Sequence, residues 1–286
     1  MATRHLKADD AKTRDLVSRR AILATAGAAA ALIGVGSDAD AAGSTSGSSM
    51  PSNISNAFTW TQGLVSDFTK ARALDTTIWK QGWFADTPSS VSGPINPNET
   101  TAYSSRNIWF DDSGIHLEVT NRPVGRWQHT GALITSHGLV SLTPGCWIEA
   151  RMHLPGSGGR LWDWPGFWLN GYDDNERQWP QNGEIDVMEG LDDGYAAWHY
   201  HWGAQAGVAT QNDGGNVDGS YTGWHTFAAH WQWGRIDYYY DSILVGSVTK
   251  NVQHNPHYMI LGHSTSNRGN ASSGVICSAV RSWTHG

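Results

Sequence analysis

The most informative segment of the chain is Asn182-Gly183-Glu184-Ile185-Asp186-Val187-Met188-Glu189-Gly190. Glycines bound it and apolar residues stand between its acids, which is typical of a β-strand. Successive side chains on a strand point to opposite faces, so Glu184 and Asp186 share one face whereas Glu189 has the wrong parity. A one-residue β-bulge near Val187-Met188 would return Glu189 to the acidic face. We therefore predict a strand whose bulge aligns three carboxylates.

Three carboxylates on one face repel each other, and this repulsion raises the pKa of at least one group and keeps it protonated. An ionised carboxylate beside a protonated one, about 5–5.5 Å apart, is the pair that a retaining glycosidase uses. A solvated acidic face and a calcium site are the other interpretations. The strictly apolar Ile185, Val187 and Met188 indicate a buried sheet rather than a ligand loop, and so favour the catalytic interpretation.

Short runs with β-rich composition recur along the chain, separated by Gly, Pro, Asn or Asp. The pair Asp241-Ser242 lies between two of them and predicts a hairpin turn. Because no long amphipathic helix accompanies these runs, we predict an all-β, two-sheet antiparallel sandwich. The other predicted strands are Gly114–Val119, Gly131–Ser136, Cys146–Leu154, Ala197–Trp202, Thr226–Trp231, Arg235–Tyr240, Ile243–Val248 and Tyr258–His263.

The composition excludes several classes of protein. The 286 residues carry a net charge of −7 and only 19 basic side chains, which argues against a nucleic-acid binder. A hydrophobic content of 39% argues against disorder, and 33 glycines argue against a helical bundle. Tryptophan occurs 16 times, more often than tyrosine and phenylalanine together.

The N-terminal region has the pattern of an export signal. Ser18-Arg19-Arg20 precedes a small-residue apolar run from 21 to 36, and Ala39-Asp40-Ala41 supplies a cleavage pattern. We predict a twin-arginine signal peptide over 1–41, a Ser/Gly-rich tether over 42–56 and one folded domain over 57–286. The apolar run is shorter than the roughly 20 residues that span a bilayer, although an uncleaved membrane-tethered helix is the alternative.

The carboxylate strand resembles the signature of glycoside hydrolase family 16, in the bulged form of its laminarinase-like branch. Further segments resemble family landmarks in the same order along the chain. They are Asn98-Glu99 with Tyr103, the strand from Gly145 to Pro155, Trp164–Leu169, Trp179-Pro180, Trp224–Trp231 and Asp237–Asp241.

The resemblance implies a jelly roll of the concanavalin and laminarinase type, with a concave substrate cleft and retaining hydrolysis of internal β-linkages. It assigns Glu184 as nucleophile, Glu189 as general acid/base, and Asp186 as the group between them that tunes their charge. No cofactor is expected. The last strand, Cys277–Trp283, lacks the Asp-Tyr that usually precedes its Val-Arg, so the structural calcium of some members is in doubt.

Aromatic side chains near the acidic strand are candidates for stacking on sugar rings. These candidates are Trp127, Trp164, Trp168, Trp179 and Trp202, whereas core packing is expected to claim more than half of all the tryptophans. In Trp198–Trp202 the rings share one face and His199 and His201 the other, and we favour His201 as a polar residue of the cleft. No third ligand at a familiar spacing supports a metal there, so none is predicted.

Two cysteines remain, Cys146 and Cys277. In an exported protein they can form a disulfide, and closing so long a loop would stabilise by about 4–5 kcal/mol in the loop-entropy model. Two separate buried thiols are the other interpretation. Of these two interpretations, we favour the disulfide between Cys146 and Cys277.

Together these features predict a secreted endo-β-glycanase acting on a neutral β-1,3-glucan or mixed β-1,3-1,4-glucan. A galactan hydrolase of agarase or carrageenase type and a transglycosylase are the alternatives that use the same glutamates. A lectin-like binding domain without catalysis is the alternative from another class. The expected partner is the polysaccharide alone, with no nucleic acid, no lasting membrane anchor and a monomeric chain.

Overall fold

The computed structural model describes residues 47–83, 91–94, 96, 98–173, 177–191, 194–205, 211–266, 269 and 271–286. The chain divides into two units, 1–40 and 41–286, and all described residues belong to the second. The predicted signal peptide over 1–41 lies outside the described residues and stays a prediction. No helix among the described residues is long and apolar enough to cross a membrane.

Strands dominate the described chain, with one short α-helix and one 3-10 turn. In chain order the elements are α1 (Ser52–Ser55), β1 (Trp60–Asp67), β2 (Lys80–Gln81), β3 (Val91–Ser92), β4 (Thr101–Ser104), η1 (Ser105–Asn107), β5 (Ile108–Asp111), β6 (Gly114–Val119), β7 (His129–Thr135), β8 (Cys146–Leu154), β9 (Gly156–Ser157), β10 (Arg160–Leu161), β11 (Trp164–Gly171), β12 (Glu184–Gly190), β13 (Ala196–Trp202), β14 (Gln211–Val217), β15 (Gly223–Gln232), β16 (Arg235–Tyr240), β17 (Ile243–Val248), β18 (His257–Ser264) and β19 (Ser273–His285).

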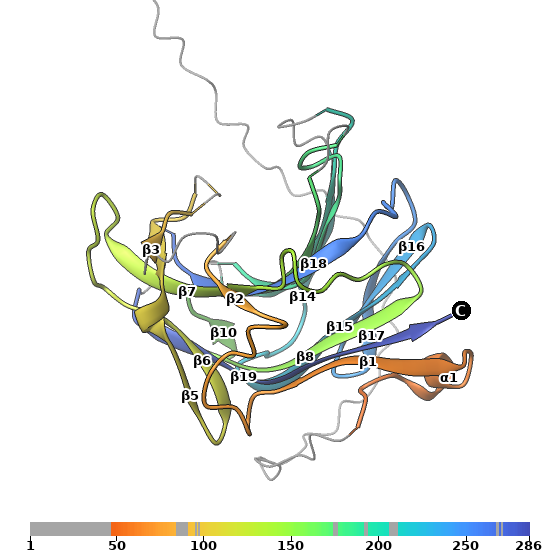
Figure 1. Ribbon diagram of the computed structural model, residues 1–286, viewed down its shortest axis with the longest axis horizontal. Helices are drawn as coiled ribbons and strands as arrows, with labels where there is room; N and C mark the ends of the chain where they lie inside the picture. The colour runs from red at the N-terminus through yellow and green to blue at the C-terminus, as the bar shows by residue number, and fades with distance from the viewer. Residues whose placement is uncertain are drawn as a thin grey trace, which may run out of the picture. The chain divides into compact units, whose positions relative to one another are not determined.

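Two large sheets carry the fold (Figure 1). The carboxylate sheet, which contains β12, has the order β14-β13-β12-β11-β18-β7-β4-β3, with β2 also on β7. The back sheet has the order β17-β16-β15-β8-β19-β6-β5, with β1 on β19. The recorded strand pairs are antiparallel except for β4 with β7. The predicted all-β, two-sheet sandwich is confirmed.

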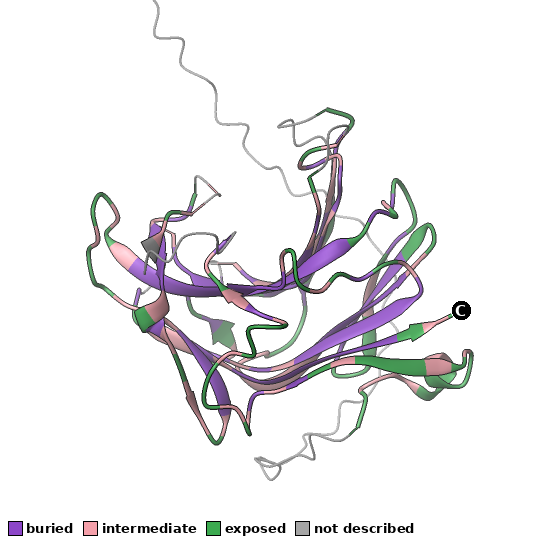
Figure 2. Ribbon diagram, viewed as in Figure 1, coloured by how far each residue is buried: buried purple, intermediate pink, exposed green. Residues whose placement is uncertain are grey.

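The core lies between the two sheets, and the alternation of residues along each strand decides what enters it. On β8, Ile148, Ala150 and Met152 are fully buried in this core. On β12, the apolar Ile185 and Val187 do the same from the other sheet. Figure 2 shows the central strands of both sheets as buried. The apolar packing leaves the acids of β12 on the face that points away from the core.

The predicted strands match the observed ones closely. The runs Gly114–Val119, Cys146–Leu154, Arg235–Tyr240 and Ile243–Val248 coincide with β6, β8, β16 and β17. At the predicted hairpin, Asp241 and Ser242 have φ angles of 48° and 68°. Two consecutive residues with positive φ are the mark of a two-residue turn that suits the twist of a hairpin.

The predicted disulfide is wrong, because Cys146 and Cys277 are separate, buried free thiols. They lie on neighbouring strands, β8 and β19, but the antiparallel register pairs Cys277 with Met152 and Cys146 with Thr284. Met152 lies six positions after Cys146 on β8, which corresponds to roughly 20 Å along the strand. Burial in the apolar core raises the pKa of both thiols to about 12.

The predicted tether also needs correction over its described part. Ser49 donates from its backbone N–H and its hydroxyl to Glu149 Oε2, at 2.9 Å and 2.6 Å. Met50 and Ile54 pack against an apolar cluster on the outer face of the back sheet that includes Trp147. The chain is therefore held on the domain several residues before 57, whereas residues 42–46 lie outside the described part.

Candidate active site

The predicted bulge is present in β12. Trp168 of β11 pairs with Asp186, but its neighbour Phe167 pairs with Met188, so Val187 is passed over. The pairing with β13 shifts at the same place, between Asp186 and Glu189. The extra residue buries both Val187 and Met188 and turns Glu189 back to the face of Glu184 and Asp186.

Glu184 receives a short hydrogen bond from the indole N–H of Trp179. The loop that carries Trp179 is fixed by Asp173, whose carboxylate accepts the backbone N–H of Trp179 at 3.2 Å and the side-chain N–H of Asn182 at 2.6 Å. Asn182 lies two residues before Glu184, so one carboxylate anchors both the backbone of Trp179 and the start of β12.

Glu189 has two partners from the neighbouring strands. The indole N–H of Trp164, at the start of β11, donates to Oε1 at 3.1 Å. The ring Nδ1 of His199, on β13, lies 2.6 Å from Oε2. Asp186 is 2% exposed, and its Oδ2 lies 3.1 Å from Nε2 of His201. Each acid of the strand therefore has a partner from a neighbouring strand or loop.

The two histidines alternate with core residues on β13. His199 and His201 pair in register with Asp186 and Glu184, so their rings point to the acidic face. Trp198 and Tyr200, between and beside them, point into the core, where the hydroxyl of Tyr200 donates to the carbonyl of Asn251 at 2.8 Å. The face that the sequence assigned to the histidines is the face of the carboxylates.

Burial is the main influence on two of the three carboxyl groups. Desolvation, reinforced by the charges of Asp186 and Glu189, raises the pKa of Glu184 to about 8. Desolvation and the charge of Glu189 raise the pKa of Asp186 well above its usual value. Glu184 therefore favours the protonated form in the free protein at neutral pH, and the pKa of Asp186 is shifted in the same direction.

Glu189 behaves in the opposite way. Burial opposes its ionisation, but the hydrogen bond and charge of His199, together with His201 and Trp164, outweigh burial and lower the pKa of Glu189. The free protein thus combines one ionised and at least one protonated carboxyl group on the same strand. That is the mixed protonation which glycosidic cleavage needs, although the proton sits on the other glutamate from the one that the family resemblance makes the acid.

The predicted sugar-stacking residues divide into three groups. Trp164 and Trp179 contact the carboxylates directly, as described above. Trp168 shares the face of Asp186 across the β11–β12 pair, with Trp83 5.8 Å away between ring centroids. Its ring lies over two glycines of the sheet, because a Cβ at Gly166 or Gly262 would come within 3.2 or 3.3 Å of it. Trp168 is half-buried and lies beside the acids.

Trp127 and Trp202 lie elsewhere. The ring of Trp127 lies beneath the guanidinium of Arg126, 4.5 Å from the ring centroid, and close to Gly93. No contact among the described residues joins it to the acids of β12. Trp202 follows His201 on β13, so it points to the opposite face and packs against the core. This position corrects its assignment to the cleft.

The chain was compared with known proteins. No family model matches it. It is 26% identical over 193 residues, 62% of the chain, to glucan endo-1,3-beta-glucosidase A1 of Niallia circulans, and it spans 28% of the length of that relative. Among solved structures, the endo-beta-1,3-glucanase of Pyrococcus furiosus has a TM-score of 0.66 at 21% identity, covering 80% of this chain and 96% of that one.

A second solved structure is the GH16 protein of the Bacteroides ovatus mixed-linkage glucan locus, in complex with an oligosaccharide product. Its TM-score is 0.61 at 22% identity, and the match covers 77% of this chain and 99% of that chain. This chain has the family 16 endo-glucanase fold. The family resemblance read from the sequence is thereby confirmed at the level of the fold.

Within this fold, the sequence named His199 and Glu99 but gave neither of them a role in the site. His199 was set aside in favour of His201, although His199 makes the shorter contact to a glutamate. The spacing His199-x-His201 was the available signal. Glu99 accepts a hydrogen bond of 2.6 Å from Tyr103, which packs with Trp83 near Trp168. Burial raises the pKa of Glu99 to about 7.

Two groups of acids and histidines among the described residues are close enough to hold a cation, and both involve β12. In each group the ligand atoms lie within 4.8 Å of one another; the groups are Glu184, Asp186 and His201, and Asp186, Glu189 and His199. Each histidine already has a carboxylate within 3.1 Å, and this pairing accounts for the clustering. We therefore assign none of these residues as a metal ligand.

Proposed function

We propose that this chain is a retaining endo-β-glycanase that hydrolyses internal bonds of a neutral β-glucan. The observation that carries the proposal is the bulged strand β12, which presents Glu184, Asp186 and Glu189 on one face. A lectin-like domain would need aromatic platforms but has no use for three acids crowded on one face of a strand, whose mutual repulsion costs stability. The family 16 endo-glucanase fold supports the same choice.

In the proposed reaction, Glu184 attacks the anomeric carbon while Glu189 gives a proton to the leaving oxygen. A covalent glycosyl-enzyme forms, and Glu189 then takes a proton from the water that releases the sugar. The indole N–H of Trp179 orients Glu184 and favours its ionised form. Asp186 lies between the two glutamates, where its protonated form reduces the repulsion between them.

For the substrate we propose a β-1,3-glucan or a mixed β-1,3-1,4-glucan. The curated relative is named for endo-1,3-beta-glucosidase activity, and one structural neighbour belongs to a mixed-linkage glucan locus. The net charge of −7 and the few basic residues disfavour a sulfated galactan, which would need a cationic surface. Half-buried Trp168, beside the acids, is the first candidate for a sugar-stacking surface.

We further propose that the enzyme is exported by the twin-arginine route, that its signal is removed on export, and that the mature form works as a monomer. It needs no cofactor in this proposal, because the acid, the base and the nucleophile are all carboxyl groups of β12. Detection of the processed form outside the cells that express it would support the export proposal, and retention of an uncleaved precursor would contradict it.

The activity is tested with purified protein on laminarin, barley β-glucan, agarose and κ-carrageenan, with released reducing ends as the readout. We expect activity on laminarin or barley β-glucan and none with the Glu184→Gln variant. Release from agarose or carrageenan alone would replace the substrate class by a galactan. Longer products with no net gain of reducing ends would indicate a transglycosylase, and binding without any turnover would favour a lectin.

A further inference from the structure

The charges of the three carboxyl groups do not explain how Glu189 comes to hold the proton that it must donate. In the free protein the ionised group is Glu189, and Glu184 favours the protonated form. The proposed acid must nevertheless hold a proton when the glycosidic bond breaks. A source of that proton within hydrogen-bond distance of Glu189 is therefore required.

Among the titratable groups that contact Glu189, His199 is placed to supply it. Its Nδ1 lies 2.6 Å from Oε2, and the two side chains are only 12% and 16% exposed. Its backbone is fixed as well, since the hydroxyl of Tyr238 donates to the carbonyl of His199 at 2.9 Å. A contact this short between two largely buried side chains is a fixed hydrogen bond rather than a loose surface ion pair.

Other titratable groups lie on the strands around the pair. Glu184 and Asp186 lie on β12, and His201 lies beside His199 on β13. Tyr238 and Tyr240 approach from β16 of the back sheet, and Asp213 lies on β14 opposite Tyr200. On β11 the residue that reaches Glu189 is Trp164, which does not titrate. Of these groups, His199 makes the shortest contact with Glu189 that carries an exchangeable proton.

We propose that His199 and Glu189 hold one proton between them, and that this shared proton makes Glu189 the general acid. His199 is thus a positioning residue, because it acts on the sugar only through Glu189. The role of the shared proton rests on the proposed glycanase function. The hydrogen bond between His199 and Glu189 is observed whatever the function is.

The proton balance closes over one turnover that starts once Glu184 has released its proton to solvent, an ionised form that the indole N–H of Trp179 favours. When a sugar displaces water, a neutral pair becomes favoured over an ion pair, so the proton moves from Nδ1 to Oε2. The imidazole becomes neutral and the carboxylate becomes a carboxylic acid. Glu189 then gives its proton to the glycosidic oxygen, which keeps the electron pair of the broken C–O bond. In the second step Glu189 removes a proton from the attacking water, and the pair returns to its one-proton state.

A shared proton affects two measurable titrations, the basic limb of the pH–rate profile and the titration of the Glu189 carboxyl group. Removing His199 must move these two titrations in opposite directions. With a second site for the same proton, the pair loses its last proton at a higher pH than a lone carboxyl group would. The basic limb of the rate profile should therefore fall to lower pH in His199→Gln. Burial raises the pKa of Glu189, and the hydrogen bond and charge of His199 counteract this effect. The pKa of Glu189 should therefore rise in the same variant.

The experiment combines both readouts on the whole chain. One is the pH profile of kcat/KM on the glucan that the substrate panel identifies, and the other is a ¹³C NMR titration of glutamate-labelled protein. The Glu189 signal is assigned by its loss in Glu189→Gln. The matched control is His225→Gln, because His225 Nδ1 pairs with Asp241 Oδ2 at 2.7 Å on the back sheet. His199→Asn serves as a second variant if His199→Gln folds poorly.

We expect the basic limb of His199→Gln to fall by about one pH unit while the Glu189 titration rises by about one unit, with neither change in His225→Gln. Shifts in the same direction, no shift, or an equal effect in the control would overturn the proposal. If the protein hydrolyses no glucan, the proposed function fails separately. The NMR titration then still decides the pairing, because an unchanged Glu189 titration in His199→Gln would refute it.

Discussion

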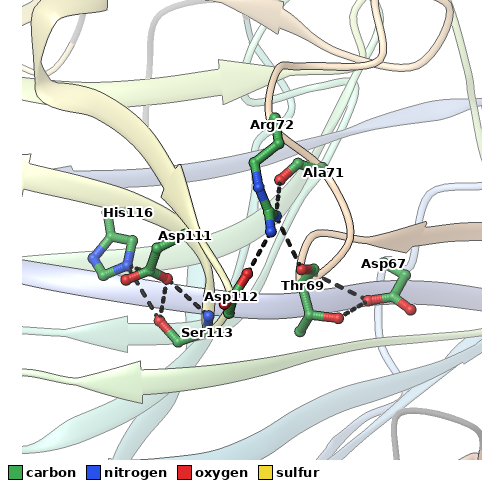
Figure 3. A network of polar contacts seen from close by, with 8 residues as sticks. All are labelled: Asp67, Thr69, Ala71, Arg72, Asp111, Asp112, Ser113 and His116. Carbon is green, nitrogen blue, oxygen red and sulfur yellow. Dashed lines mark hydrogen bonds and ion pairs between the residues drawn. The ribbon is translucent and has the colours of Figure 1, made fainter.

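Two regions of the molecule pair a histidine with a carboxylate, and they differ in what surrounds the pair. On β12 and β13, His199 lies 2.6 Å from Glu189 within the acidic face. At the turn between β5 and β6, His116 lies 2.9 Å from Asp111, whose side chain is 45% exposed (Figure 3). Figure 3 also shows Ser113, which donates to Asp111 from its backbone N–H and its hydroxyl.

The difference lies in the balance between burial and hydrogen bonding. Around Asp111, the hydrogen bonds of Ser113 and His116 outweigh the opposing desolvation, and they hold the pKa of Asp111 far below its usual value. Around β12, burial competes with the same kind of bond, so neighbouring acids end in different protonation states. A pair at an exposed turn stabilises local structure, whereas the pair on the acidic face of β12 serves the proposed reaction.

The largest expected effect is a loss of kcat that follows substitutions on β12 but not a substitution at the Asp111 turn. Glu184→Gln and Glu189→Gln should each lower kcat on the glucan substrate by about 10³-fold or more, because each removes a reacting carboxyl group. Asp111→Asn should leave kcat unchanged. Initial rates of reducing-end release measure all three. A Glu184→Gln variant that keeps a tenth of wild-type activity would remove β12 from the mechanism.

The indole that holds Glu184 should matter less than the acid itself. Trp179→Phe keeps an aromatic ring but loses the N–H donor to Glu184, so kcat should fall about 10-fold to 100-fold. Trp109→Phe is the matched control, since Trp109 donates to Glu118 at 2.8 Å on the back sheet. Equal losses in both variants, measured as kcat with folding checked by circular dichroism, would deny Trp179 a specific role.

The thermal stability of the protein should decrease at high pH because of the raised pKa of Glu184. The pKa of Glu184 is raised to about 8, so the folded state favours its protonated form and loses that stabilisation as pH rises through 8. Glu184→Gln stays neutral throughout. Its Tm should equal that of the wild type at pH 5 and exceed it by about 5 °C at pH 9. A difference in Tm that does not grow between these pH values would contradict the buried, raised pKa.

The smallest effect belongs to the exposed pair. The pKa of Asp111 is lowered, so its stabilising contribution is present above its unfolded pKa and is lost only as pH falls through the folded value. Between pH 5 and pH 9 the Asp111→Asn variant should therefore show a small and constant loss of Tm, about 1–2 °C. Thermal melts across this range measure it, and a loss that changes sign with pH would be inconsistent with an exposed turn pair.

The sequence predicted features whose cause is local. The alternation of acids and apolar residues placed the bulge at Val187-Met188, and the turn residues placed the hairpin at Asp241-Ser242. Both depend on the period of a strand and the preferences of a turn, which a few neighbouring residues determine. The same local rule separated the rings from the histidines on β13.

Features that depend on register between distant strands escaped prediction. The cysteine pairing failed because only the β8–β19 register shows Cys277 beside Met152. Ser49 binds Glu149, which lies 100 residues further along the chain. Because this contact is so distant in sequence, the Ser/Gly-rich composition alone predicted an unattached tether. Trp202 was assigned to the cleft because local alternation tells which residues share a face but not which face meets the core.

The central claim is that Glu184 and Glu189 act as the nucleophile and acid/base of a retaining reaction. The most direct measurement is the anomeric configuration of the first product released from a β-glucan, followed by ¹H NMR before mutarotation. Two inversions at the anomeric carbon should give the β-anomer first, with the α-anomer appearing only as the solution equilibrates. Initial formation of the α-anomer would show a single displacement and would contradict the account.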